Sequence, residues 1–340
     1  MKIGLDEHFD KIKLRRFIFP SVVMLIFSSI YVLVDGLFIS NYCSVDAFAG
    51  VNFVFPFIQA LIALGMMFGA GGSALIAKTI GEKNLIKARS YFSFITYSSI
   101  VIGVIFTVAL YFALPPVMKW LGATGELLDS AIIYGQALTL FIPAAIVQMA
   151  FQAYFITAEK SKIGTIVTVA SGCLNILLDY LFIGVLKMDV LGAALGTGLC
   201  HVAGAVASLI FFFLPNKTSL LRLGKCNFEF KGLLKSITNG SSELVTYLST
   251  STVVIIYNAQ LLKYVGNTGV AAYGVLMYVI LIFLAVYFGY NLGVAPLVSY
   301  NYGAQNHPEL QNLTKKSINF ILIASILMTV LCYALAYPMT

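Results

Sequence analysis

The sequence has few charged residues, and this scarcity decides the class of protein. Only 10% of its 340 residues are charged, whereas 60% are hydrophobic. A soluble domain carries about 25% charged residues, so this chain could not cover the surface of one. Paired spacing is also missing from its five cysteines, which excludes an evident disulfide or metal-binding framework. We therefore predict an all-α protein that crosses a membrane several times.

Long runs without charge predict where the membrane spans lie. A run of about 20 apolar residues is enough to cross a bilayer as a helix, and several runs here exceed that length. Nine spans can be drawn on this basis: 17–40, 47–77, 90–114, 130–157, 163–186, 190–214, 236–262, 270–299 and 317–338.

Lysine and arginine are absent from the interior of every predicted span, and their distribution predicts the orientation. If the N-terminus is cytoplasmic, all 21 basic residues lie on the inner side except Lys119, Lys187 and Lys263. Loops rich in Lys and Arg stay in the cytoplasm, so we predict a cytoplasmic N-terminus. The net charge of +7 then reflects topology, and a nucleic-acid partner is not expected.

An internal repeat predicts how the spans are grouped. A shift of 224 positions aligns Gly65 and Gly69 of the second span with Gly289 and Gly293 of the eighth. Repeated transmembrane halves are typical of transporters, with the substrate site at the interface between the halves. We predict an N-terminal lobe of six helices, a cytoplasmic linker and a partial C-terminal lobe of three helices: 1–214, 215–235 and 236–340.

The second copy of the repeat ends after three spans, whereas the first copy has six. Six spans precede the second copy, so both copies have the same orientation and the axis that relates them lies along the membrane normal. We expect an intact protein of twelve spans in two parallel six-helix repeats, of which this chain holds nine.

Three acidic residues lie within predicted spans: Asp35, Asp179 and Glu243. A charge near the bilayer centre costs at least about 2.5–3.5 kcal/mol, so an intramembrane acid is by default a functional hypothesis. Asp35 lies roughly 8 Å and Asp179 about 12 Å from the outer ends of their spans, at 1.5 Å per residue. These similar depths predict that the two carboxyl groups meet.

Polar residues at comparable depth extend this predicted site. Asn175 is four residues before Asp179 and therefore shares its helix face, while Thr197 and Tyr134 enter their spans from the same outer side. Two carboxylates close together in a low dielectric cannot both ionise at low cost, so such a pair is expected to exchange a proton. The same oxygens suit Na⁺, and the residues alone leave H⁺ and Na⁺ open.

Each of these residues also has a purely structural interpretation. Asp35 and Asp179 could be interhelical hydrogen-bonding residues, although such bonds stabilise membrane helices only modestly. Asn175 and Thr197 taken singly are as typical of helix packing as of ligation. Glu243, about two turns from the inner end of its span, either reaches the interface or faces a central cavity as a substrate or second ion site.

Three stretches resemble a known family of membrane proteins. VDGLFIS ends the first span, GAGGSALIAKTIGEKN closes the second, and NILLDYLFI lies in the fifth. Together they resemble the multidrug and toxic compound extrusion (MATE) family, in particular its DinF- and MepA-like bacterial branch. The resemblance covers the whole chain. It implies twelve helices in two lobes that form a V around a central cavity.

The resemblance also implies a function and a set of site residues. Members of the family export cationic, lipophilic drugs across the bacterial inner membrane, driven by entry of H⁺ or Na⁺. A first-span aspartate and a fifth-span Asn-x-x-x-Asp form their cation site, which matches Asp35, Asn175 and Asp179. Tyr134 and Thr197 resemble the residues that complete it, and Glu243 resembles a seventh-span glutamate of another branch. We expect a monomer with no cofactor besides the coupling ion and no enzymatic activity.

Other functions explain the residues less well. A related flippase for lipid-linked saccharides would need cationic residues in its cavity to hold a pyrophosphate, and the spans contain none. An intramembrane aspartyl protease would need YD and GxGD motifs, whereas the two aspartates here lie in VDG and LDY. A scaffold or receptor without transport activity would leave the shared depth of the polar residues unexplained.

Overall fold

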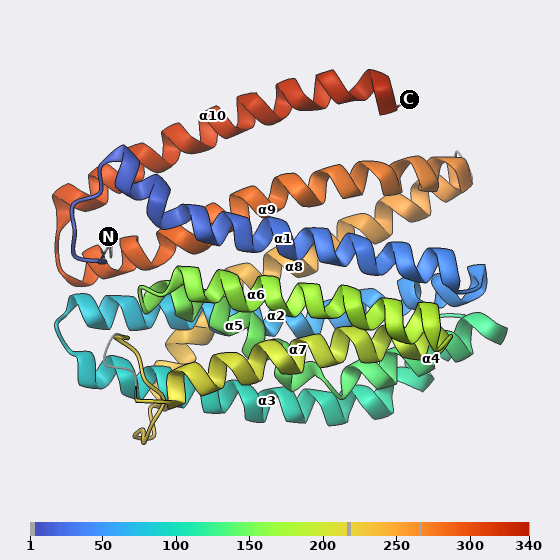
Figure 1. The fold of residues 1–340 in the computed structure, drawn as a ribbon, viewed down its shortest axis with the longest axis horizontal. Coiled ribbons are helices and arrows are strands. Elements are labelled where there is room, and N and C mark those ends of the chain that lie inside the picture. Colours follow the sequence, from blue (N-terminus) through green and yellow to red (C-terminus); the bar gives the residue numbers. More distant parts are fainter. Residues whose placement is uncertain (1–3, 216–218, 265–266, 340) are drawn as a thin grey trace.

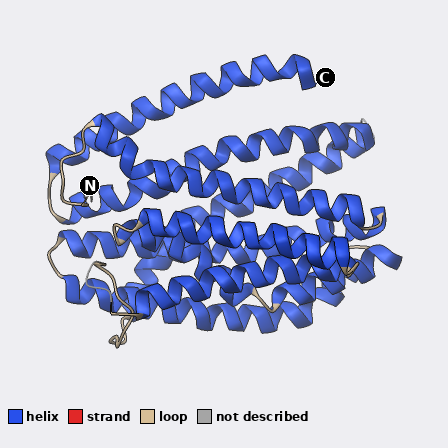
Figure 2. Ribbon diagram, in the orientation of Figure 1, coloured by secondary structure: helices blue, strands red, loops and turns tan. Residues whose placement is uncertain are grey.

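The computed structural model describes residues 4–215, 219–264 and 267–339, which form helices and connecting loops without a strand (Figures 1 and 2). One π-helical turn, η1, interrupts the series of α-helices. In chain order the elements are α1 (Lys11–Tyr42), α2 (Val45–Gly81), α3 (Leu85–Trp120), α4 (Gly125–Thr139), α5 (Ile142–Thr157), α6 (Ser161–Asp179), η1 (Tyr180–Val185), α7 (Asp189–Phe213), α8 (Phe230–Tyr264), α9 (Asn267–Gly303) and α10 (His307–Met339).

Fewer helices qualify as membrane spans than the nine predicted. Among the described residues, seven helices are long and apolar enough to cross a membrane, or eight if the bent pair α4 and α5 is one span. The predicted span 236–262 lies in α8, whose described residues do not qualify; a run of Ser, Thr, Asn and Glu lowers its hydropathy. The count of nine is therefore not confirmed.

The predicted span 130–157 is broken rather than continuous, with 59° between α4 and α5. Pro143, in the first turn of α5, has no N–H and disfavours helical geometry in the residue before it. The break frees the carbonyl group of Thr139, which accepts a hydrogen bond from the Thr107 hydroxyl at 3.2 Å. Backbone groups must be paired inside a bilayer, so this bond from α3 stabilises the bend.

Helix α2 runs through the middle of the bundle and packs against α3, α4, α5, α8 and α9 (Figure 1). Glycines allow the closest approaches. A Cβ atom at Gly71 would collide with the carbonyl oxygen of Ser236 on α8, and one at Gly240 would collide with that of Met67. Backbone therefore meets backbone where the N-terminal part (residues 1–214) touches the C-terminal part (residues 236–340).

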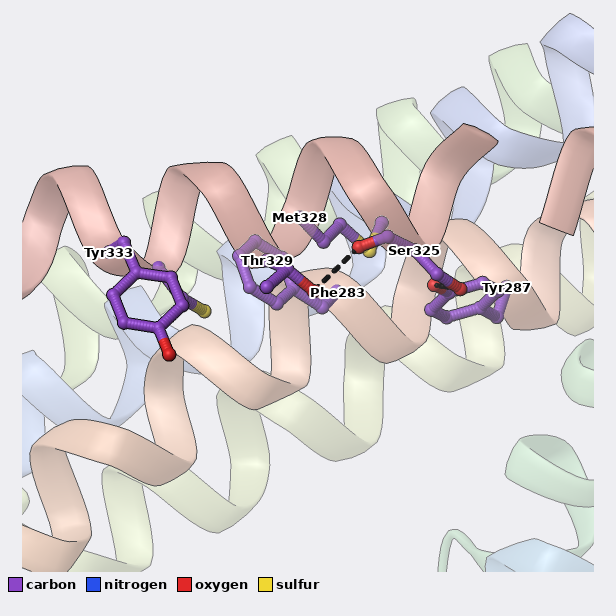
Figure 3. A pocket seen from close by; sticks show the side chains of 7 residues that line it. Phe283, Tyr287, Ser325, Met328, Thr329 and Tyr333 are labelled. Carbon is purple, nitrogen blue, oxygen red and sulfur yellow. Dashed lines mark hydrogen bonds between the residues drawn. The ribbon is translucent and has the colours of Figure 1, made fainter. Parts of the chain in front are cut away.

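Three further features complete the description of the bundle. Aromatic rings of α3, α5 and α7 form a core around Phe92, Phe151 and Phe212, with edge-to-face contacts typical of buried rings. Helix α10 lies at the periphery (Figure 1), and many of its apolar side chains are exposed, as expected for a helix that faces lipid. An open groove between α9 and α10 is lined by Tyr287, which bonds to Ser325 at 2.8 Å (Figure 3).

Candidate functional site

The carboxyl groups of Asp35 and Asp179 lie together inside the N-terminal part. Asp35 projects from α1 and is half-buried, whereas Asp179, the last residue of α6, is fully buried. The two carboxyl groups lie close enough to interact electrostatically with each other. Because neither ionised carboxylate can donate, a hydrogen bond between them requires one of them to carry a proton.

Asn175 links Asp179 to the next helix. Its Nδ2 donates to Asp179 Oδ1 at 3.5 Å and to Thr197 Oγ1 on α7 at 3.3 Å. Asn175 is fully buried and Thr197 is half-buried. Helices α6 and α7 are thus joined by side-chain bonds at the depth of the acid pair.

Three buried oxygens at this place have no hydrogen-bond partner: Asp35 Oδ1, Asp179 Oδ2 and Asn175 Oδ1. Buried polar atoms are normally paired, and each unpaired one needs an explanation. A small hard cation suits such oxygens, because it prefers carboxylate and amide ligands, and a proton on one carboxyl group would let that group donate a hydrogen bond. Among the described residues no group of three His, Cys, Asp or Glu could hold a metal ion.

Local backbone geometry positions Asp179. The α-helical pattern ends at this residue and six residues of π-helix follow, in which the Leu186 N–H donates to the Leu181 carbonyl group at 2.8 Å. Short π-helical stretches inside α-helices occur frequently at functional sites. Gly196 of α7 lies directly against Asp179 Oδ1, so that a Cβ atom there would collide with the carboxyl group.

Tyr134 closes the cluster from α4. The side chain is 2% exposed and lies near enough to interact electrostatically with both Asp35 and Asp179. The structure therefore brings together all five residues predicted for the cation site, from α1, α4, α6 and α7: Asp35, Tyr134, Asn175, Asp179 and Thr197.

Glu243 lies elsewhere, in a cavity of about 240 Å³ between α2, α5, α8 and α9. Its Oε1 accepts a hydrogen bond from Asn291 Nδ2 at 3.1 Å, and the side chain is half-buried. Other polar lining residues are Ser73, Asn239 and Ser242, and none of the described residues that line the cavity is Lys or Arg. Of the two alternatives for Glu243, the structure favours the one in which it faces a cavity.

Sequence reasoning missed two residues that position the acids. Gly196 immediately precedes Thr197, and Asn291 is an amide inside the predicted span 270–299. An intramembrane amide is a signal that could have been used, because it needs a partner there. The contact between Gly196 and Asp179 depends on how α6 and α7 pack, so no pattern in the sequence indicates it.

Another buried polar pair lies one helical turn from Thr197. His201 Nδ1 pairs with Gln148 Oε1 at 2.7 Å, and the histidine side chain is buried. This pairing satisfies one ring nitrogen of the histidine within the N-terminal part.

An all-helical bundle with a buried acid pair on one side and an acidic cavity between two parts defines a membrane protein of the transporter type. The MatE family model matches residues 20–181 and 243–340. The chain belongs to this family.

Two relatives at the sequence level are both named multidrug export protein MepA. The chain is 26% identical over 304 residues to the multidrug export protein MepA of Staphylococcus saprophyticus, covering 89% of this chain and 67% of that protein. It is also 26% identical over 337 residues to MepA of Staphylococcus aureus strain MRSA252, covering 95% of this chain and 71% of that protein.

Solved structures share the fold. A multidrug resistance MATE family transporter of the MOP superfamily, in its outward-facing conformation, superposes with a TM-score of 0.88 at 21% identity, covering 94% of this chain and 71% of that one. A MOP superfamily transporter from Pyrococcus furiosus, described as having a binding pocket of reversed polarity, gives a TM-score of 0.87 at 22% identity, with 97% and 73% covered.

Proposed function

We propose that this protein is a cation-coupled antiporter that exports cationic, lipophilic drugs or toxic metabolites by alternating access. One observation carries the proposal: three unpaired oxygens lie buried at the contact between Asp35, Asp179 and Asn175. A buried site of this kind needs a cation or proton for part of its cycle. The relatives named multidrug export proteins support the export of drugs.

In the proposed mechanism the coupling ion binds at the acid pair. An H⁺ or Na⁺ that enters from outside binds between Asp35 and Asp179, with Asn175 and Thr197 as neutral donors or ligands. Binding changes the charge and hydrogen bonding of α1 and α6, which pack against each other. The ion drives the cycle only if it binds one conformation of these helices more tightly than the other.

The cavity between the two parts supplies the substrate site in this proposal. Glu243 provides a negative charge, and the described lining residues include no Lys or Arg to oppose it. Alanine, Met66 and Phe288 side chains add apolar surface. Such a lining favours a lipophilic cation over an anion, because charge complementarity sets the preferred ligand class.

The topology is proposed from the same charge pattern that the sequence shows. Turns α2–α3, α5–α6 and α9–α10, together with the segment between α7 and α8, lie at one end of the bundle (Figure 1). This basic end holds most of the lysines and arginines and is the cytoplasmic end under the positive-inside rule. We place the protein as a monomer in a bacterial inner membrane, without enzymatic activity.

A flippase for lipid-linked saccharides is the alternative function. The likeness to the Pyrococcus furiosus transporter of reversed pocket polarity concerns the fold alone. Here Glu243 gives the cavity negative polarity, which opposes the binding of a pyrophosphate. If the wild-type protein does not export ethidium but does transport a lipid-linked sugar, the flippase is favoured.

The proposed function is tested by ethidium efflux from cells that lack their own exporters, with external pH and Na⁺ varied independently. Asp35→Asn and Asp179→Asn should each abolish efflux, because an amide cannot exchange the proton or carry the charge. Asp46→Asn, an exposed aspartate at the start of α2, is the matched control. Wild-type efflux that depends on only one of the two gradients, H⁺ or Na⁺, would identify the coupling ion. Full efflux in Asp35→Asn would refute the site.

A further inference from the structure

The N-terminal segment, residues 4–10, lies across the basic end of the bundle beside the α9–α10 turn (Figure 1). Two of its side chains are buried: Leu5 is 1% exposed and Phe9 is fully buried. Both belong to an apolar cluster that includes Ile156 of α5, Leu297 of α9 and Leu313 of α10. The segment is therefore packed between the N-terminal and C-terminal parts.

Glu309, in the first turn of α10, binds this segment. Its Oε1 accepts hydrogen bonds from the Phe9 N–H at 3.1 Å and from Asn312 Nδ2 at 2.8 Å, while Oε2 pairs with His8 Nδ1 at 2.5 Å. Asn312 Nδ2 also donates to the Phe9 carbonyl group at 3.0 Å, and Lys316 donates to the same carbonyl oxygen. Helix α10 thus holds both polar backbone groups of Phe9.

The other end of the segment is bound to the N-terminal part. The Leu5 N–H donates to Glu159 Oε1, between α5 and α6, at 2.9 Å. Within the segment, Glu7 accepts from the Gly4 N–H at 3.1 Å and pairs with Lys13 at 2.9 Å. The Lys13 side chain and then the Gly4 N–H hold the pKa of Glu7 below its usual value, so Glu7 is ionised at neutral pH.

The segment continues directly into α1, the helix that carries Asp35. Asp10 caps α1 by accepting from the Lys13 N–H at 2.7 Å. A bond between α10 and Phe9 consequently ties the C-terminal part to the beginning of the helix that holds one acid of the candidate ion site.

We propose that residues 4–10 are a clasp that holds the basic end of the bundle closed, with Glu309 as its anchor. The inference rests on the proposed function, because only alternating access requires this end to open. Opening would separate α10 from α1, and the hydrogen bonds of Glu309 to His8 and Phe9 must break first. The clasp then stabilises the conformation that is closed at the basic end.

The first test locks the clasp covalently. The five native cysteines are replaced by serine, and His8→Cys is combined with Glu309→Cys, because these two side chains are in contact. Ethidium transport is measured in inside-out vesicles before oxidation with copper phenanthroline, after it, and after reduction with dithiothreitol. Oxidation should reduce transport at least tenfold and reduction should restore it. Unchanged transport with a disulfide verified by mass spectrometry would overturn the proposal.

A matched cross-link controls for the effects of oxidation. Ser44→Cys with Glu126→Cys joins α2 to the start of α4, both in the N-terminal part, where the two side chains bond at 2.5 Å. This disulfide should leave transport unchanged, because it does not connect the two parts.

A second test does not depend on transport. Ser242→Cys, in the cavity, is labelled with a membrane-impermeant maleimide added from the basic side of the same cysteine-free protein. Glu309→Gln should accelerate labelling several-fold. Glu82→Gln, which removes an ion pair within α2 only, should not. An unchanged rate in Glu309→Gln would refute the clasp. Accelerated labelling without any ethidium transport would retain the clasp and refute the proposed function instead.

Discussion

Gly196 limits how the Asp179 carboxyl group can be placed, since any larger residue at this position would occupy the same space. The acid pair, Asn175 and Thr197 could be predicted from sequence because intramembrane polar residues are rare and their depth follows from helical rise. Gly196 could not, because its importance appears only once α6 and α7 are packed together.

At this scale we expect Gly196→Ala to displace Asp179 and impair ion coupling. The added methyl group costs about 1–3 kcal/mol if the surroundings do not adjust, and moving the carboxyl group removes that strain. Ethidium efflux should therefore require a higher concentration of the coupling ion.

Gly224→Ala is the control for Gly196→Ala, because a Cβ atom at Gly224 meets no other atom within 4 Å. Both variants should be compared by thermal unfolding in detergent as well as by efflux. An unaltered ion dependence in Gly196→Ala would show that the glycine does not position the carboxyl group.

At the scale of the helices, composition predicted where most of the chain is apolar but not where it bends. The stretch 130–157 contains no charged residue, so its hydropathy predicts one span. Pro143 breaks the helix, and the hydrogen bond from the Thr107 hydroxyl to the Thr139 carbonyl group stabilises the break. The π-helical turn after Asp179 could not be predicted either, because an extra residue in a helical turn does not change the hydropathy profile.

Thr107→Val should destabilise the bent pair of α4 and α5. It leaves the Thr139 carbonyl group without its partner from α3, and bonds of this kind contribute about 0.6–1.7 kcal/mol in membrane proteins. Thr314→Val is the control: its hydroxyl bonds to the Leu310 carbonyl group within its own exposed helix turn. Unfolding in detergent micelles should show a lower midpoint for Thr107→Val than for Thr314→Val, and equal midpoints would contradict the assignment.

At the scale of the whole molecule, the candidate ion site and the cavity occupy different places. The acid pair lies within the N-terminal part, among α1, α4, α6 and α7, whereas Glu243 lies where the two parts meet. The sequence predicted the interface through its internal repeat, yet the repeat organisation itself stays a prediction. If ion and substrate bind at separate places, their affinities should be separable by mutation.

Glu243→Gln should weaken the binding of cationic substrates while leaving ion dependence unchanged. Glutamine keeps an oxygen for the bond from Asn291, so the cavity should retain its shape and lose only its charge. We expect KM for ethidium to rise about tenfold, equivalent to about 1.4 kcal/mol, with little change for an uncharged substrate.

The ion dependence of efflux distinguishes this variant from Asp35→Asn. In Glu243→Gln the concentration of H⁺ or Na⁺ that gives half-maximal transport should match that of the wild type, because Asp35 and Asp179 remain intact. A shift in that concentration would place Glu243 in the ion pathway. An unchanged KM for ethidium would mean that the cavity charge does not select the substrate, and the preference for cations would then have to arise elsewhere.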